Sequence, residues 1–363
     1  MKQRHSLFLL SIVFSFLCVS FAIASSHISN DSLRARIDSF IVATVQSKYA
    51  ASILVSVDKD VILEKGYGFA DSTKQVPTTD ETLFNIASIT KSFTASAILI
   101  LEEEGKLHLS DSISKYFHDT SADKRAITIQ QLLIHTSGLK QDYVSDGIVN
   151  RDSAVAVILR DTLASKPGKD TSYSNLNYEL LGAIVEIASG KPYEEFITKH
   201  IFEPAHMKKT IFWSQADTQH IGIIASKNRA LTPDILRRNW GYIGSAGIYS
   251  NVEDLFRWYI SVKSLYYLNP KHFFMMWPKY AVTKTEFTPG WFISNTNGAK
   301  EIWTRGSEDW GHNAVVRWFP DNNFLIIIQT NSGEIGSDKE ATGNRILSDG
   351  ILKILCESAG PCK

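Results

Sequence analysis

Runs of β character lie at both ends of this 363-residue chain, with a long helical region between them, and this order constrains the fold most. Near the N-terminus, two runs at 53–57 and 61–69 are joined by a polar turn at 58–60, which predicts a hairpin. Near the C-terminus, four short runs rich in Trp, Phe, Ile and Val predict strands: 290–294, 301–305, 314–319 and 324–330. The pattern therefore predicts one sheet assembled from both ends of the chain, with a helical lobe inserted.

Apolar residues at helical spacing predict the helices of an α+β fold. The predicted helices are 31–48, 88–104, 128–135, 152–163, 175–189, 192–200, 251–263 and 340–356. Since no internal repeat or low-complexity linker interrupts the pattern, we expect residues 25–363 to form a single domain. Its sheet lobe spans about 31–84 and 266–363, and its helical lobe about 85–265. A substrate pocket is expected between the two lobes.

The overall charge balance excludes some classes of partner. The chain has 38 basic and 38 acidic side chains and no basic run, so nucleic acid is not an expected partner. Its 44% hydrophobic and 21% charged residues are ordinary for a soluble globular protein. We expect a monomer that acts on a small molecule or a peptide.

The N-terminus has the pattern of a secretory signal. Lys2 and Arg4 precede an apolar stretch at 7–23 that ends in Ala22-Ile23-Ala24, which predicts cleavage after Ala24 and a periplasmic or secreted protein. The alternative is an uncleaved membrane anchor. In an exported chain, Cys356 and Cys362 either form a disulfide or remain two free thiols.

Ser88 and Lys91 indicate a catalytic site, because their spacing places a hydroxyl and an amine on the same face of a helix. A lysine held neutral can take the proton of a serine that attacks a carbonyl. The same spacing starts at Ser56, Ser112, Ser121 and Ser137, and we interpret those four pairs as solvent-facing. Ser88 differs because it opens a long apolar helix, with Asn85 as the expected N-cap, and a helix start favours developing negative charge.

Two further segments supply the partners that this serine requires. Tyr173 and Asn175 lie on a loop just before a predicted helix, where a phenol and an amide can face a cleft. His312 begins the strand at 314–319 and is placed to relay a proton to a leaving group. The other histidines, His135 among them, are interpreted as loop or surface residues. No pair has metal-ligand spacing, so neither a metal nor another cofactor is expected.

These motifs, with the stretches 127–139, 173–178 and 244–250, resemble the serine β-lactamase and penicillin-binding superfamily. The closest branch contains class C β-lactamases, DD-carboxypeptidases and related esterases. The resemblance covers roughly residues 30–355 and implies an antiparallel sheet flanked by helices plus an all-helical lobe.

The resemblance also implies roles for individual residues. Ser88 is the acylated nucleophile, and Lys91 is its proton acceptor or positioning partner. Tyr173 is a general base and acid, Asn175 binds the amide carbonyl of the substrate, and His312 stands where the family has Lys or His. The order in which Lys91 and Tyr173 take the proton stays open, since the two titrate as a coupled pair.

The oxyanion hole and the third motif follow from the same comparison. The backbone N–H groups of Ser88 and Val315 are the expected oxyanion donors. After His312, the family has a hydroxyl residue or Gly and then Gly, whereas this chain has Asn313 and Ala314. We expect Asn313 to contact substrate with altered geometry and the methyl group of Ala314 to narrow the pocket.

The sequence thus predicts an exported serine hydrolase that forms an acyl-enzyme at Ser88. An amide substrate is favoured, as in a D-Ala-D-Ala carboxypeptidase or a β-lactamase. The alternatives are a carboxylesterase of the same fold and a non-catalytic homologue that binds penicillin or peptidoglycan, because a fold alone does not determine turnover.

Overall fold

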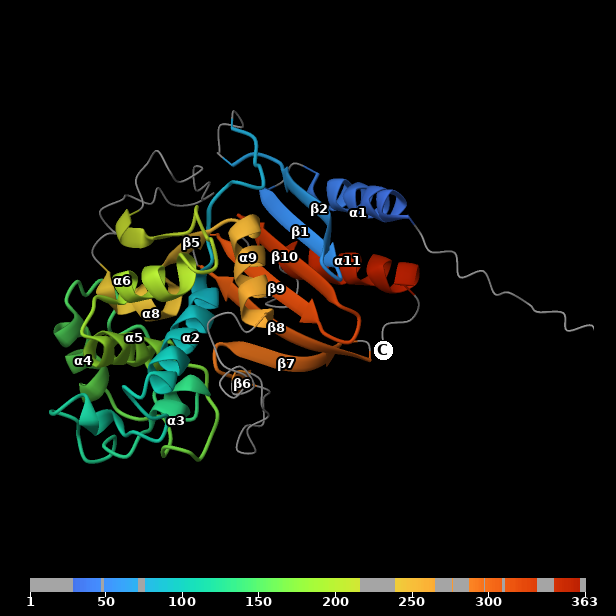
Figure 1. The fold of residues 1–363 in the computed structure, drawn as a ribbon. Helices are drawn as coiled ribbons and strands as arrows, with labels where there is room; N and C mark the ends of the chain where they lie inside the picture. Colours follow the sequence, from blue (N-terminus) through green and yellow to red (C-terminus); the bar gives the residue numbers. More distant parts are fainter. Residues whose placement is uncertain are drawn as a thin grey trace, which may run out of the picture.

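A seven-stranded antiparallel sheet is built from both ends of the chain, as the sequence predicted (Figure 1). The computed structural model describes residues 29–46, 49–70, 76–215, 239–264, 276, 287–296, 298–308, 311–331 and 343–359. In spatial order the strands are β2 (Asp60–Tyr67), β1 (Ala51–Val57), β10 (Phe324–Thr330), β9 (Asn313–Phe319), β8 (Ala299–Ser307), β7 (Trp291–Thr296) and β6 (Phe287–Thr288). The N-terminal hairpin thus pairs with the last strand of the chain, and the α+β class is confirmed.

The central strands are apolar on both faces because each face carries its own core. Every residue of β9 and β10 is buried. Along β10, Leu325 and Ile327 join the core that continues into the helical lobe, whereas Ile326 and Ile328 join the core on the opposite face. This is the alternation that a strand imposes on successive side chains, and it explains the continuous apolar runs in the sequence.

Helices from the two ends of the chain cover one face of the sheet. Helix α1 (Asn30–Val45) and helix α11 (Gly343–Ala359) lie side by side there (Figure 1). Helix α9 (Val252–Lys263) packs across β1 and β10 on the opposite face. Its buried Leu255 and Trp258 belong to the core shared by the sheet and the helical lobe, and Trp258 stacks on both Phe93 and Trp291, so the predicted boundary at 265 follows a helix that contacts both lobes.

The remaining helices form the inserted lobe, with α2 packed on α5 at its centre. The α-helices are α2 (Thr90–Glu103), α3 (Ile129–Leu133), α4 (Arg151–Arg160), α5 (Asn175–Ser189), α6 (Tyr193–Ile197) and α8 (Ile243–Ala246). Four short segments are 3₁₀-helical: η1 (Ala87–Ile89), η2 (Ile113–Lys115), η4 (Trp213–Gln215) and η5 (Trp240–Tyr242). The segment η3 (Thr198–Phe202) is π-helical. A small sheet that the sequence did not predict joins the lobes; its strand order is β3 (Phe84–Asn85), β5 (Ile248–Ser250) and β4 (Ile211–Phe212).

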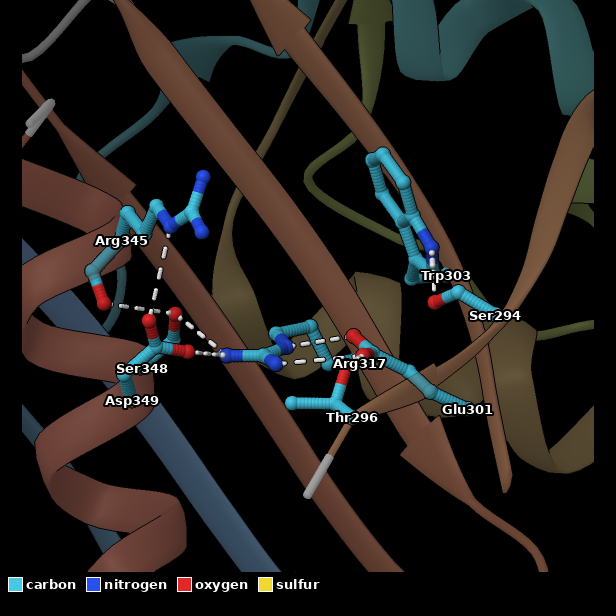
Figure 2. Close-up of polar contacts among 8 residues, drawn as sticks. All are labelled: Ser294, Thr296, Glu301, Trp303, Arg317, Arg345, Ser348 and Asp349. Atoms are coloured by element: carbon cyan, nitrogen blue, oxygen red, sulfur yellow. Dashed lines mark hydrogen bonds and ion pairs between the residues drawn. The ribbon is translucent and has the colours of Figure 1, made fainter. Parts of the chain in front are cut away.

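A buried ion cluster ties strands β8 and β9 to the last helix (Figure 2). Arg317 of β9 is 7% exposed, and its guanidinium lies 2.5 Å from the carboxylate of Glu301 on β8 and 2.6 Å from that of Asp349 on α11. Ser348 accepts a further hydrogen bond from Arg317. Because the buried cation has two carboxylate partners, its charge is compensated and α11 is fixed in register against the sheet.

Two predictions concern the chain ends. The expected signal segment, 1–24, lies outside the described residues. Within the described part, no helix has both the length and the apolarity needed to cross a membrane. Cys356 is disulfide-bonded rather than a free thiol, and its expected partner Cys362 lies outside the described residues.

Candidate active site

Ser88 lies in the short turn η1, immediately before α2 begins at Thr90. Ala87, the residue before it, has φ 45°, a left-handed conformation that a side chain adopts only under strain. The side-chain oxygen of Asn85 accepts a hydrogen bond of 2.5 Å from the Ala87 N–H and thereby holds this turn. Asn85 therefore fixes the nucleophile turn rather than acting as the N-cap of α2.

Two side chains reach the Ser88 hydroxyl, one from each side. Lys91 Nζ lies 3.0 Å and the Tyr173 hydroxyl 2.8 Å from Ser88 Oγ. Lys91 also donates to the backbone carbonyl of Ser245 at 2.9 Å, and its amine lies 5.1 Å from the centre of the Tyr173 ring. The structure thus brings together the three residues predicted to be catalytic.

Lys91 is buried without a carboxylate ion pair among the described residues. Its side chain is 3% exposed, and a nearby acid is Glu179 of α5. Burial raises the pKa of Glu179 to about 8, although a hydrogen bond from Ser145 opposes the shift. Glu179 is therefore mostly protonated at neutral pH and does not compensate the charge of Lys91.

The three side chains face a cavity at the boundary between the lobes. It is lined by Ser88, Lys91, His135, Tyr173, Phe287, Thr288, Gly290, Trp291, Phe292, Thr304 and Arg305. One wall comes from the helical lobe, and the other comes from β6, β7 and β8. The location agrees with the pocket expected between the two lobes.

His135 is the site residue that sequence reasoning misassigned. It is 4% exposed, has φ 58°, and packs its ring 4.7 Å from that of Tyr173. Its Nδ1 accepts the backbone N–H of Ser174 at 3.1 Å. Burial and, second, the charge of Lys91 lower the pKa of His135 to about 3, so the ring is neutral and positions the Tyr173 loop. The sequence signal at this position is the stretch 127–139, which resembles the family but does not by itself indicate that His135 is buried beside Tyr173.

Asn175 stands at the first residue of α5, two positions after Tyr173. It is 8% exposed and does not line the cavity, although the loop that carries it is anchored through Ser174 to His135. The structure therefore places Asn175 beside the site, and its contact with a substrate amide stays a prediction.

His312 does not take the position expected for a proton relay. It is 1% exposed, packs on Phe84, and its Nδ1 accepts the backbone N–H of Asn85 at 2.9 Å. Burial lowers its pKa to about 3, and it does not line the cavity. His312 is therefore a neutral residue that supports β3, the short strand before Ser88. It immediately precedes β9, which is not the strand that meets the serine turn.

The predicted roles at the oxyanion hole and the pocket are also corrected for three residues of β9, because this strand does not meet the serine turn. These residues are Val315, Asn313 and Ala314. β9 is an interior strand, and Val315 lies between Arg305 of β8 and Ile328 of β10. Its N–H is directed within the sheet and cannot serve as an oxyanion donor. Asn313 accepts a hydrogen bond from Ser307 and does not reach the cavity, and Ala314 is 1% exposed opposite Gly306.

The strand that meets the nucleophile is β8. A Cβ atom on Gly306 would lie 2.1 Å from the Ile86 carbonyl oxygen and 2.7 Å from the Ser88 nitrogen, so only glycine allows this approach. Thr304 and Arg305 precede it and line the cavity. Strand β7 pairs with β8 only as far as Trp303, which leaves the edge from Thr304 onward to face the serine turn.

This arrangement suits nucleophilic attack on a carbonyl. A hydroxyl with two adjacent proton carriers, held on a strained turn and facing a cavity, has the elements of an activated serine. Among the described residues, no group of three or more His, Cys, Asp or Glu side chains is arranged to hold a metal ion.

Curated proteins of two bacterial species are similar to this chain in sequence. The chain is 34% identical over 245 residues to the protein flp of Staphylococcus aureus strain MW2, which covers 64% of this chain and 49% of that protein. It is 30% identical over 212 residues to the putative penicillin-binding protein PbpX of Bacillus subtilis strain 168, covering 58% and 54%. The chain thus spans about half the length of these curated relatives.

Solved structures resemble the chain over most of its length. The D-amino acid amidase of Ochrobactrum anthropi SV3, complexed with D-phenylalanine, matches with a TM-score of 0.76 at 21% identity, over 90% of this chain and 99% of the amidase. FmtA of Staphylococcus aureus matches with a TM-score of 0.74 at 23% identity, over 90% and 91%. At these identities the likeness shows the fold. The Beta-lactamase family model matches residues 37–349, and the chain therefore belongs to the Beta-lactamase family.

Proposed function

We propose that the protein is a serine hydrolase that works through an acyl-enzyme on Ser88. The observation that carries this proposal is the contact of one hydroxyl with two proton carriers, Lys91 at 3.0 Å and Tyr173 at 2.8 Å, beside a cavity. General acid–base groups at such distances contribute about 10²–10⁴-fold to a rate.

The reaction proceeds in two halves. Lys91 as the neutral amine, or Tyr173 as the phenolate, takes the Ser88 proton as Oγ bonds to the substrate carbonyl carbon. When the tetrahedral intermediate collapses, the carbon–leaving group bond breaks and the leaving group receives that proton. Water then attacks the ester and gives a proton to the same base. The bond between the acyl carbon and Ser88 Oγ breaks, the base returns the proton to Oγ, and the acid is released.

The oxyanion hole is proposed at the contact between the serine turn and β8. The Ser88 N–H is one donor. The second is a backbone N–H of β8 after Trp303, in place of the Val315 N–H that the sequence predicted. This choice is supported by the close approach of Gly306 to the Ser88 nitrogen. Each such donor stabilises the transition state by about 3–4 kcal/mol.

For the substrate we propose an amide, as in a D-Ala-D-Ala carboxypeptidase or a β-lactamase. The D-amino acid amidase that shares the fold supports amide chemistry. A carboxylesterase is the alternative, since an ester passes through the same acyl-enzyme. We also propose that the protein is exported and acts as a monomer without a cofactor.

A substrate panel tests this proposal. Purified protein is incubated with a D-alanyl-D-alanine peptide, a penicillin and a p-nitrophenyl ester, and product release is measured for wild type and Ser88→Ala. We expect turnover of the peptide or the penicillin by wild type alone. Ester turnover alone would favour the carboxylesterase. Turnover of none, with cooperative unfolding intact, would favour a binding protein.

A further inference from the structure

A line of aromatic rings leads away from the nucleophile along the outer strands of the sheet. The ring of Tyr173 lies 6.2 Å from that of Phe287, which lies 4.9 Å from Phe292. Phe292 in turn stacks on Trp303 at 4.3 Å, with 16° between the ring planes. All four side chains are partly exposed, so the line forms a surface connected to the cavity.

The outer part of this line is held rigidly by the sheet. Phe292 and Trp303 are cross-strand partners on β7 and β8. The indole N–H of Trp303 donates to Ser294 Oγ at 3.0 Å (Figure 2), so its polar edge is satisfied and its plane is fixed. Because the indole N–H is hydrogen-bonded and the two stacked rings are partly exposed, another apolar ring can pack against them without leaving a polar group unpaired.

Arg305 adds a positive charge at the end of this pair of rings. It lies two residues after Trp303, on the same face of β8, with its guanidinium 5.7 Å from the centre of one Trp303 ring. Arg305 is exposed and lines the cavity that contains Ser88.

The partners of Arg305 contrast with those of Arg317, which points from the same face of the sheet. Arg317 is paired with Glu301 and Asp349, whereas Arg305 forms no ion pair within the described residues. A guanidinium presents a planar fork of donors that matches a carboxylate, and here that fork stays available at the cavity.

We propose that Phe292, Trp303 and Arg305 form a specificity subsite for a substrate group that carries an apolar ring ending in a carboxylate. The ring stacks beside Phe292 and Trp303, and the carboxylate accepts hydrogen bonds from Arg305. A cationic group at the same place is repelled. This inference rests on hydrolysis at Ser88, because it concerns the selection of substrates for that serine.

The test uses four p-nitrophenyl esters with one leaving group. The acyl groups are acetyl, 4-carboxyphenylacetyl, the methyl ester of that acid, and 4-trimethylammoniophenylacetyl. We expect the acid to have the lowest KM, by about fivefold against its neutral ester, the scale of one partly exposed charge pair. The cation should have the highest KM.

Variants separate the ring from the charge. Arg305→Gln should abolish the preference for the acid, measured as the ratio of its KM to that of the neutral ester, while Arg305→Lys retains part of that preference. Trp303→Leu should raise KM for all three ring esters by about fivefold relative to the acetyl ester, the scale of one aromatic contact. Lys300→Gln, an exposed residue of the same strand outside the cavity, is the matched control and should change none of these ratios.

The outcomes distinguish the subsite from the proposed function. Absence of turnover of every ester, including acetyl, would count against hydrolysis at Ser88 itself. Turnover of the acetyl ester with equal KM for acid, neutral ester and cation would overturn the subsite. An acid preference that survives Arg305→Gln would do the same, because the charge would then come from elsewhere.

Discussion

Two turns of this protein have the same Ser-x-x-Lys spacing and a similar distance between hydroxyl and amine, and the turn at Ser88 is the one that lines the cavity described above. At Ser88 and Lys91 the Nζ–Oγ distance is 3.0 Å, and at Ser121 and Lys124 it is 3.3 Å. Both lysines are buried, with exposed fractions of 3% and 2%. We had interpreted the second pair as solvent-facing, which was wrong for Lys124.

The two turns differ in how the lysine charge is compensated. Lys124 lies 3.1 Å from the exposed carboxylate of Asp123, whose pKa is held low by hydrogen bonds from Ser121 and Lys124. Lys91 is surrounded instead by the Ser245 carbonyl, the Tyr173 ring and the largely protonated Glu179. Spacing therefore brings hydroxyl and amine together, and the surrounding charges decide whether the pair is a stable surface contact or a reactive one.

The largest difference between the two turns is expected in kcat when each lysine is exchanged for alanine. We expect Lys91→Ala to lower kcat by about 10²–10⁴-fold, the usual contribution of a general base. Lys124→Ala should leave kcat unchanged and reduce the free energy of unfolding by about 1 kcal/mol through lost packing of its stem. Steady-state kinetics and urea unfolding of both variants check this. Equal losses of activity would show that the two turns are not functionally distinct.

The second prediction concerns the strand that meets the reactive turn. A methyl group in Gly306→Ala would collide with backbone atoms of Ile86 and Ser88, so we expect about 100-fold loss of acylation and about 1–3 kcal/mol of destabilisation. The matched change is Ala314→Gly on β9, which is opposite Gly306 but away from the cavity. It should cost about 1 kcal/mol of stability and leave acylation unchanged. Faster turnover of bulky amides by Ala314→Gly would contradict the placement of β9.

The neutral acid beside Lys91 gives a prediction about pH. The pKa of Glu179 is about 8 in the folded protein and 4.5 as its reference value, so the folded state retains a proton that the unfolded state loses. Glu179 should therefore reduce stability as the pH rises from about 4.5 to about 8, by up to about 5 kcal/mol at about 1.4 kcal/mol per pKa unit. Glu179→Gln should flatten this decline in chemical unfolding series. An unchanged decline would mean that Glu179 is ionised in the folded protein.

The smallest effect is expected at the compensated turn. In Asp123→Asn the exposed carboxylate is lost, and Lys124 retains its contact with Ser121. Because exposed ion pairs contribute little, the unfolding midpoint and the rate of ester hydrolysis should both stay within error of wild type. A clear loss of hydrolysis would show that the charge of Lys124 influences the distant cavity.

Much of the fold was predictable because it depends on local periodicity. The apolar runs of β9 and β10 and the helical spacing in α1, α2 and α5 gave element type and, within a few residues, bounds. The packing of α9 on the sheet was not predictable, because its apolar stripe fits either lobe. The two- and three-residue strands β3, β4 and β5 are too short for periodicity to indicate.

The site was predictable only where its residues are close in sequence. Ser88, Lys91 and the Tyr173 loop carry local signals: a helix start, helical spacing and a loop before a helix. The edge strand was misassigned, because β8 and β9 both begin near polar residues and only sheet order shows that β8 meets the serine. Gly306 was therefore missed as the residue through which β8 approaches Ser88.

The most direct test of this account is covalent labelling of the two serines. The protein is treated with a fluorophosphonate and digested, and the modified residue is identified by mass spectrometry for wild type and Lys91→Ala. We predict a stoichiometric adduct on Ser88 in wild type, much slower labelling of Ser88 in Lys91→Ala, and no adduct on Ser121. Labelling of Ser121 at a comparable rate, or Ser88 labelling that is unaffected by Lys91→Ala, would contradict the account.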